Sequence, residues 1–216
     1  MPNPEDEPDE FWNGEKFLTY LEEKTVGKDA SNAANWYAHY QLGISYLIAG
    51  RNEDARDEFA RSVDLTSNAW AYHGLACLYL KSDPEKAKQF IMEGMALQRE
   101  RLSYQKEGFK ILEKCGAYKE IDEEYKKQTA ENQKNGRIQY YYVAALAKLE
   151  RNEEAYHLLN DGDGIDVSDI REGDSDIQSI WESLHEKVYG EKGHLPHYYN
   201  FKVKLKKVSI KMEEML

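Results

Sequence analysis

The chain has 216 residues, a length that fits one domain or one elongated array of repeats. Forty Asp and Glu against 29 Lys and Arg give a net charge of −11, which disfavours nucleic acid as a partner because duplex binding needs a concentrated basic face. No run of apolar residues is long enough to span a membrane, and the acidic start lacks the apolar core of a secretory signal. Two cysteines, Cys77 and Cys115, are too few for a disulfide framework, so we expect a cytoplasmic, reduced protein in which both are small apolar fillers.

The N-terminal segment, residues 1–35, begins with an acidic stretch. Its first ten residues contain three prolines and five acidic residues, a composition that predicts a loose arm. A short helix is expected from about residue 10 to residue 23, with Phe11, Leu18 and Leu21 on one face, and residues 24–32 are expected to form a linker.

Residues 36–160 contain an internal repeat. The first unit has Leu42-Gly43-x2-Tyr46, a turn, and then Ala55-x3-Phe59. This resembles the tetratricopeptide pattern W-x2-L-G-x2-Y, turn, A-x3-F, with a histidine in place of the leading tryptophan. Small residues at positions 43 and 55 allow the two helices of the unit to approach closely. Asn52, which follows the turn, is expected to cap the second helix.

The spacing of later units supports the repeat. The equivalent second-helix positions Ala55, Ala87, Ile121 and Ala155 are 32, 34 and 34 residues apart, and the repeat length of this class is about 34. The turn at residues 51–55 recurs almost unchanged at residues 151–155. The alternative is a generic helical bundle with chance spacing. We favour an all-α fold, a tetratricopeptide-like right-handed superhelix of about four helix pairs.

Residues 161–216 have a different composition. A turn-rich loop is followed by a helix expected over residues 176–189, whose apolar stripe would cover the open end of the last repeat. A serine at position 175 and a glutamine three residues later are typical of a capping box at its start. The basic tail, residues 201–216, fits both a strand and a helical face, and both alternatives stay open.

A second resemblance depends on Arg171-Glu172-Gly173, Trp181 and the segment 195–202. Together with the array, from Trp36 to Lys202, these features resemble the C-terminal helical-repeat region of large bacterial proteins of unknown function that also carry a galactose-mutarotase-like β domain. This chain lacks that domain and extends past the family's usual ending. The resemblance therefore implies no catalytic residue here, and Arg171 is interpreted as a structural residue.

Sequence signatures of catalysis are absent. There is no nucleophile elbow, phosphate-binding loop, dinucleotide fingerprint or zinc-protease motif. His194 and His197 lack nearby cysteines that would complete a zinc set. Asp161, Asp163 and Glu172 have the spacing of three EF-hand positions, but the glycine that the loop needs is missing. We therefore expect no enzyme, no cofactor and no metal.

The stronger functional signal is a groove. In this repeat class the first helix of each pair lines a concave surface, which would be aromatic at one end and basic at the other. The expected groove residues are Tyr37, Tyr40, Trp70, His73, Lys106, Lys110, Lys114, Arg137, Tyr140 and Lys148. Aromatic residues and arginine are common interface anchors. The alternative, that the rings pack between helices and the lysines only solvate a face, has equal weight.

We predict a protein–protein interaction module that holds an extended or helical, acidic partner segment in this groove, with no nucleic acid, no membrane and no assigned oligomeric state. A chaperone-tail adaptor is excluded because two clamp positions, expected to be Lys and Asn, are Tyr40 and Ile44. The alternative, implied only by the second resemblance, is an accessory module of bacterial carbohydrate metabolism beside a separate β-rich protein. A further hypothesis places the acidic arm across Lys106, Lys110 and Lys114, masking the groove through weak, salt-sensitive pairs.

Overall fold

The computed structural model describes residues 2–8, 14–162, 164–168, 170 and 176–199. Over these residues the secondary structure consists of eleven α-helices and one 3-10 turn, packed largely in chain order, which confirms the all-α prediction. The basic tail and the Arg171-Glu172-Gly173 segment lie outside the described residues, as do Asp163 of the EF-hand spacing and Phe11 of the expected first helix. None of the described helices has the length and apolar character that crossing a bilayer needs.

The chain forms two compact units, Met1–Ala117 and Tyr118–Leu216. The boundary falls between the two helices of the third predicted pair, a division that the sequence did not indicate. The segments 1–35, 36–160 and 161–216 stay a prediction. Each unit is described below by itself.

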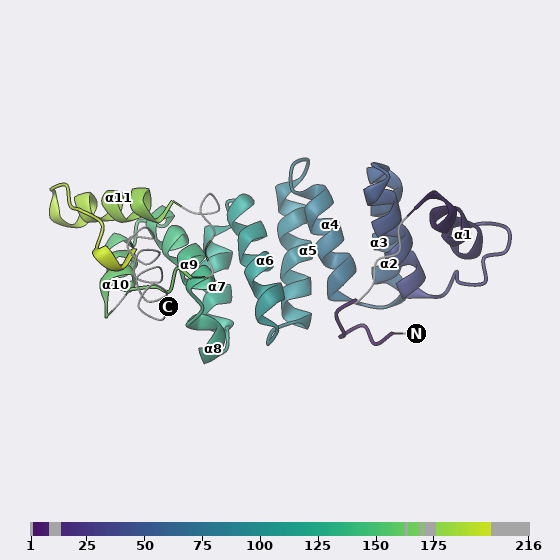
Figure 1. The fold of residues 1–216 in the computed structure, drawn as a ribbon, viewed down its shortest axis with the longest axis horizontal. Coiled ribbons are helices and arrows are strands. Elements are labelled where there is room, and N and C mark those ends of the chain that lie inside the picture. The colour runs from purple at the N-terminus through teal and green to yellow at the C-terminus, as the bar shows by residue number, and fades with distance from the viewer. Residues whose placement is uncertain (1, 9–13, 163, 169, 171–175, 200–216) are drawn as a thin grey trace, which may run out of the picture. The chain divides into compact units, whose positions relative to one another are not determined.

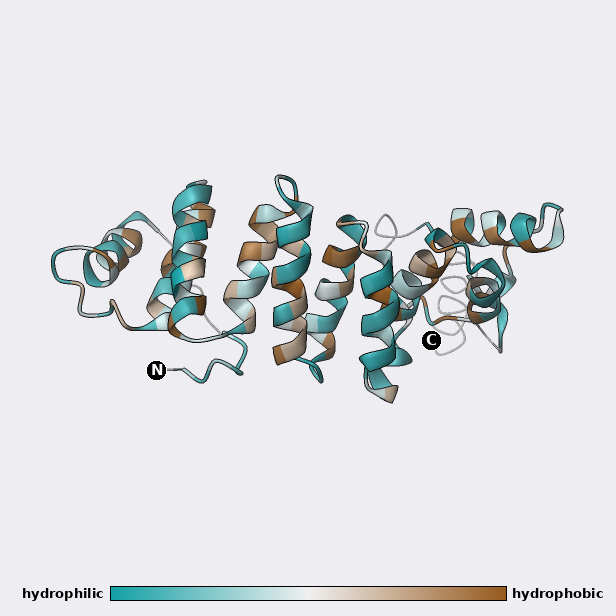
Figure 2. Ribbon diagram, turned by 180° about the vertical axis from the view of Figure 1, so that it is seen from behind, coloured by the Kyte–Doolittle hydropathy of each residue, from teal (hydrophilic) through white to brown (hydrophobic). Residues whose placement is uncertain are grey.

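The first unit contains six helices that pack against their neighbours in sequence (Figure 1). They are α1 (Glu15–Thr25), α2 (Trp36–Ile48), α3 (Asn52–Leu65), α4 (Ala69–Tyr79), α5 (Pro84–Leu97) and α6 (Leu102–Lys114). The pairs α2–α3 and α4–α5 correspond to the first two predicted repeat units. Along these helices hydrophobic and hydrophilic residues are interleaved (Figure 2).

Polar side chains set the starts of several helices in this unit. The Asn35 side chain accepts hydrogen bonds from the backbone N–H groups of residues 37 and 38, and the Asn68 side chain accepts one from that of residue 71. Asp83 caps α5 in the same way and is followed by a proline at the first helical position. The expected cap at Asn52 is wrong: Asn52 is the first residue of α3, and Arg51 precedes it without a side-chain capping bond.

Phe59 is the centre of the core of the first unit. Its ring is fully buried between two glycines, Gly43 on α2 and Gly74 on α4. A Cβ atom at Gly43 would lie 2.8 Å from one edge of the ring, and a Cβ at Gly74 would lie 2.7 Å from the other edge. The predicted anchors Ala55 and Ala87 are also fully buried. The close approach expected at Gly43 is confirmed, and Gly74 provides a second one.

The second unit contains α7 (Tyr118–Lys127), α8 (Ala130–Gln133), α9 (Gly136–Lys148), α10 (Asn152–Asn160), α11 (Ile177–Tyr189) and a 3-10 turn (His197–Tyr199). The anchors Ile121 and Ala155 are fully buried, as predicted. Helix α11 packs on α10 and buries Ile177 and Trp181, so the expected capping helix is present. Its N-cap is the residue at position 176, and position 175 lies outside the described residues. The short helix α8 was not predicted.

The recurring turn builds the same ion-pair arrangement in both units. In each, an arginine at the start of a second helix contacts an acid three residues later and an acid 29 residues earlier, on a preceding helix. The pairs are Arg51 with Asp54 and Glu22 (2.6 and 2.7 Å) and Arg151 with Glu154 and Asp122 (2.6 and 2.8 Å). Helix α1 therefore occupies the place of a second helix relative to α2, as α7 does relative to α9.

Candidate partner-binding surface

The predicted groove residues are divided between the two units. Those in the first unit are Tyr37 and Tyr40 on α2, Trp70 and His73 on α4, and Lys106, Lys110 and Lys114 on α6. Those in the second unit are Arg137, Tyr140 and Lys148, all on α9. All of them lie on helices, and their place on a concave surface stays a prediction.

The two tyrosines of α2 differ in how much surface they offer. Tyr40 is 5% exposed and packs on Phe59 with a centroid distance of 5.9 Å, so it belongs to the core. Burial, with smaller contributions from Tyr37 and Glu7, raises the pKa of its phenol. Tyr37 is half-buried, and its hydroxyl accepts a hydrogen bond of 2.8 Å from the Gln41 side chain. Tyr37 is therefore the tyrosine of this pair that can contact a ligand.

On α4, Trp70 and His73 both meet Tyr104 of α6. The Tyr104 ring lies edge-on to Trp70 at 5.6 Å and to His73 at 6.1 Å, and its hydroxyl donates to the Ala69 carbonyl at 2.7 Å. Burial lowers the pKa of His73, against an opposing effect of Glu107, so its imidazole is neutral at pH 7. At pH 7 this part of the surface is therefore aromatic and carries no positive charge from His73.

Cys77 follows His73 by one turn of α4 and is exposed, so its prediction as a buried filler is wrong. Its sulfur lies 3.9 Å from both ring nitrogens of His73. Loss of solvation raises the pKa of the Cys77 thiol, and Glu107 adds to this effect. Thiol and imidazole are both neutral at pH 7, so the pair lacks the thiolate that a cysteine nucleophile requires.

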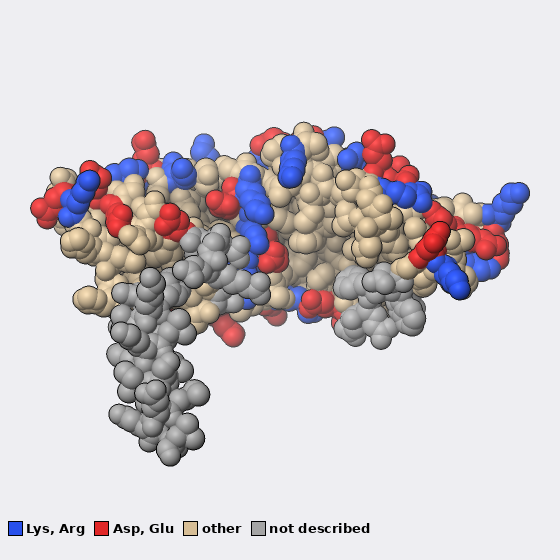
Figure 3. Space-filling model, turned by 45° about the horizontal axis from the view of Figure 1, so that its top comes forward, with Lys and Arg blue, Asp and Glu red and all other residues tan. Residues whose placement is uncertain are grey.

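The three lysines of α6 follow one another at four-residue intervals and so lie on one face of the helix. Lys106 and Lys110 are half-buried and already interact with other groups of the protein, whereas Lys114 is exposed. On the face drawn in Figure 3, basic side chains are interspersed with acidic ones and with wide areas of neither charge.

In the second unit the three predicted residues have separate environments. The Tyr140 hydroxyl accepts a hydrogen bond of 3.3 Å from the backbone N–H of Asp176, at the start of α11. Its ring meets Tyr141 edge-on at 5.5 Å. Arg137 is half-buried and has interactions within the protein, and Lys148 is exposed at the end of α9. Tyr140 of α9 therefore helps to hold the start of α11 in place.

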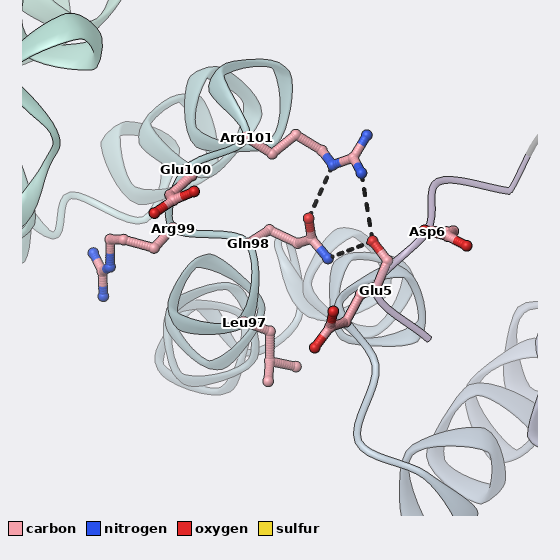
Figure 4. Close-up of a pocket in the computed structure, with 7 residues that line it drawn as sticks. All are labelled: Glu5, Asp6, Leu97, Gln98, Arg99, Glu100 and Arg101. Carbon is pink, nitrogen blue, oxygen red and sulfur yellow. Dashed lines mark hydrogen bonds between the residues drawn. The ribbon is translucent and has the colours of Figure 1, made fainter. Parts of the chain in front are cut away.

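Two residues that the sequence analysis did not single out, Gln98 and Arg101, hold the acidic arm. Gln98 is buried at the end of α5, and Arg101 precedes α6 with its guanidinium 5.6 Å from the centre of the Trp70 ring. The Arg101 Nε–H donates to the Gln98 side-chain oxygen at 2.9 Å. The Gln98 amide and the guanidinium both donate to the Glu5 carbonyl, at 2.9 and 3.4 Å (Figure 4). A second guanidinium nitrogen donates to the Glu7 carboxylate at 3.1 Å.

An open pocket of about 630 Å³ surrounds these contacts. It is lined by Glu5 and Asp6 of the arm, by Leu97 at the end of α5 and by residues 98–101 of the α5–α6 loop (Figure 4). The described part of the arm thus docks on the first unit at this loop, and contact of the arm with the lysines of α6 stays a prediction. The acidic residues at positions 9 and 10 lie outside the described residues. This loop carries two arginines, Arg99 and Arg101, and helical periodicity cannot identify residues in a loop.

No protein-family model matches the chain, and no curated protein matches its sequence. In the part of the chain that the structure describes, no group of three or more His, Cys, Asp or Glu side chains comes together in a way that could hold a metal ion.

Proposed function

We propose that the protein is an interaction module of the tetratricopeptide-like class, and that the first-helix surface of its first unit holds an extended acidic segment of a partner protein. We define this surface as Tyr37, Trp70, Arg101, Lys106, Lys110 and Lys114. The observation that carries the proposal is the run of four basic residues along α6 and its N-cap, beside half-buried aromatic rings, in a protein of net charge −11.

The chemistry of this surface favours an acidic ligand. Opposite charges steer an encounter and select the partner, while the aromatic rings provide contact area at low cost in side-chain entropy. Exposed ion pairs each contribute about 0–1 kcal/mol, so several must act together, and the affinity should fall with salt. An extended segment suits the surface because Trp70 on α4 and Lys114 at the end of α6 lie on successive first helices.

The test is the binding of defined peptides to the full chain. Seven-residue peptides with zero, two and four acidic residues are compared by calorimetry, using the native protein and the variant Lys106→Gln/Lys110→Gln/Lys114→Gln. We expect binding to increase with the number of acids and to be lost in the variant. The matched control is Lys28→Gln/Lys81→Gln/Lys86→Gln, which removes the same charge at exposed positions of the first unit outside this surface.

Equal binding by the two triple variants would contradict the proposal, as would equal binding of neutral and acidic peptides. The variant and its control also serve to identify the partner by mass spectrometry of proteins retained from lysate. The alternative of an accessory module in carbohydrate metabolism depends on the sequence resemblance alone, and no feature of the described residues favours it.

A further inference from the structure

The α5–α6 loop of the first unit contains a pre-arranged set of hydrogen-bond donors. The Gln98 side chain accepts the Nε–H of Arg101, which fixes the amide and the guanidinium relative to each other. Gln98 is only 7% exposed, and a neighbouring side chain, Gln105, donates to its backbone carbonyl at 2.8 Å. The aromatic face of Trp70 lies against the guanidinium. The donors are thus held in place by the fold.

These donors converge on one main-chain carbonyl and one side-chain carboxylate of the arm. The Gln98 amide and one guanidinium nitrogen both point at a single carbonyl oxygen, that of Glu5. The other guanidinium nitrogen contacts a carboxylate two residues later, that of Glu7. Glu5 lies in a turn, in which the backbone N–H of Asp6 donates to the carbonyl of Asn3 at 3.1 Å. The loop therefore binds one carbonyl and one carboxylate, two residues apart, of an acidic segment that turns at this point.

We infer that this loop is a recognition site for an acidic peptide of the form x-x-Asp/Glu, in which Gln98 and Arg101 hold the carbonyl of the first residue and Arg101 holds the carboxylate of the third. Residues 2–8 occupy this site as an internal ligand. The inference rests on the proposed function and specifies its partner: an acidic segment of another protein that replaces the arm.

Several observations favour an exchangeable ligand. The Glu7 side chain is 55% exposed and that of Arg101 is 35% exposed, so water and salt compete for the pair. The pocket around the contacts is open, which leaves room for side chains larger than those of the arm. The Trp70 Nε1–H is buried and has no acceptor among the described residues, a group that a different ligand could satisfy.

When the arm occupies the site for part of the time, the apparent affinity for an external ligand equals the intrinsic affinity multiplied by the fraction of time that the site is empty. If the arm is bound for most of the time, removing it strengthens the binding of an added peptide about 3- to 10-fold. The probe is a labelled peptide that copies residues 2–8, blocked at both ends, and a second copy carries Glu7→Gln. Binding is measured by fluorescence anisotropy at low salt.

The peptide is added to three full-length proteins. One is native, one has residues 2–8 replaced by Gly and Ser at unchanged length, and one combines that replacement with Arg101→Gln. We expect the second to bind the peptide about 3- to 10-fold more tightly than the first and the third to lose binding. The Glu7→Gln peptide should bind more weakly to the second protein. Arg61→Gln, which removes an exposed arginine from α3, is the matched control for charge and should change nothing.

Equal affinity for the native and replaced-arm proteins would show that the arm does not occupy the site. Unchanged affinity after Arg101→Gln would show that the loop is not the site. If acidic peptides bind through the lysines of α6 and ignore Arg101, the proposed function stands and this inference fails. If no acidic peptide binds to any variant, both fail. Far-UV circular dichroism of each variant shows whether a loss of binding reflects unfolding.

Discussion

Replacing Gly74 with alanine tests the packing that joins the first two helix pairs. A Cβ at this position would lie 2.7, 2.8 and 2.9 Å from three atoms of the Phe59 ring. The ring cannot move away, because its other edge already lies against α2 at Gly43. Forcing an extra carbon into a filled core costs about 1–3 kcal/mol. Alanine recovers about 1 kcal/mol of helix propensity. We therefore expect a net loss of stability of about 1 kcal/mol from these two opposing terms.

The double variant with Phe59→Leu separates the clash from helix propensity. Leucine lacks the ring edge that faces Gly74, so in that background only the propensity remains, and Gly74→Ala should stabilise by up to about 1 kcal/mol. The coupling between the two changes is then about 1–3 kcal/mol, as expected for residues in contact. Gly43→Ala with Phe59→Leu is the matched cycle on the opposite edge of the ring.

The assay must report on the first unit, since a chain with two compact units need not unfold in one step. Hydrogen exchange, read by mass spectrometry on peptides from α3 and α4, gives the free energy of opening of these helices. A Gly74→Ala effect of the same sign and size in both backgrounds would refute the reasoning, because it would show that the Phe59 ring does not limit the space at Gly74.

Three further predictions concern the second unit. Burial alone would raise the pKa of Asp122, but hydrogen bonds from Lys126 and Arg151 outweigh it, so the pKa in the folded protein is lowered. Asp122 therefore stabilises the fold at pH values above its unfolded pKa of about 3.9. This stabilisation is lost as the pH falls through the lower pKa of the folded state. Asp122→Asn should flatten that loss in a pH series of urea unfolding, and an unchanged series would contradict it. Gly136→Ala places a Cβ 1.6 Å from the backbone carbonyl oxygen of residue 166, so it should displace that loop and speed its cleavage in limited proteolysis; an equal cleavage rate would count against the contact. Tyr199→Phe removes a hydroxyl that donates to the carbonyl of Leu159 in α10 at 2.8 Å and accepts from the backbone N–H of Ile165 at 3.0 Å. The loss should lower the free energy of unfolding by about 1–3 kcal/mol, measured by thermal unfolding. An unchanged stability would show that these two bonds are unimportant.

The repeat was predictable because its signal is physical and local. Positions 55, 87, 121 and 155 must be small or apolar to let paired helices meet, and all four residues there are fully buried. Gly74 and the division after Ala117 were not visible, because both depend on contacts between helices that no short motif records. The cap expected at Asn52 failed because the helix begins one residue earlier than the turn pattern suggested.

The candidate site was predictable only in part. Helical spacing placed Tyr37, Trp70 and the α6 lysines on first helices, but it could not tell that Tyr40 is buried in the core. Gln98 and Arg101 were missed because they lie in a loop, where no periodicity applies. Their role depends on an arm more than 90 residues away in sequence, and only the fold brings the two together.

The most direct test of the account is a side-chain NMR titration of the full-length protein whose residues 2–8 are replaced by Gly and Ser, with the blocked acidic peptide that copies the native residues 2–8. The account predicts that the Gln98 amide and Arg101 Nε–H resonances shift together as peptide fills the empty site, and that high salt reverses the change. Shifts confined to other parts of the chain, with these two groups unchanged at saturation, would contradict the claim that this surface of the first unit binds an acidic segment.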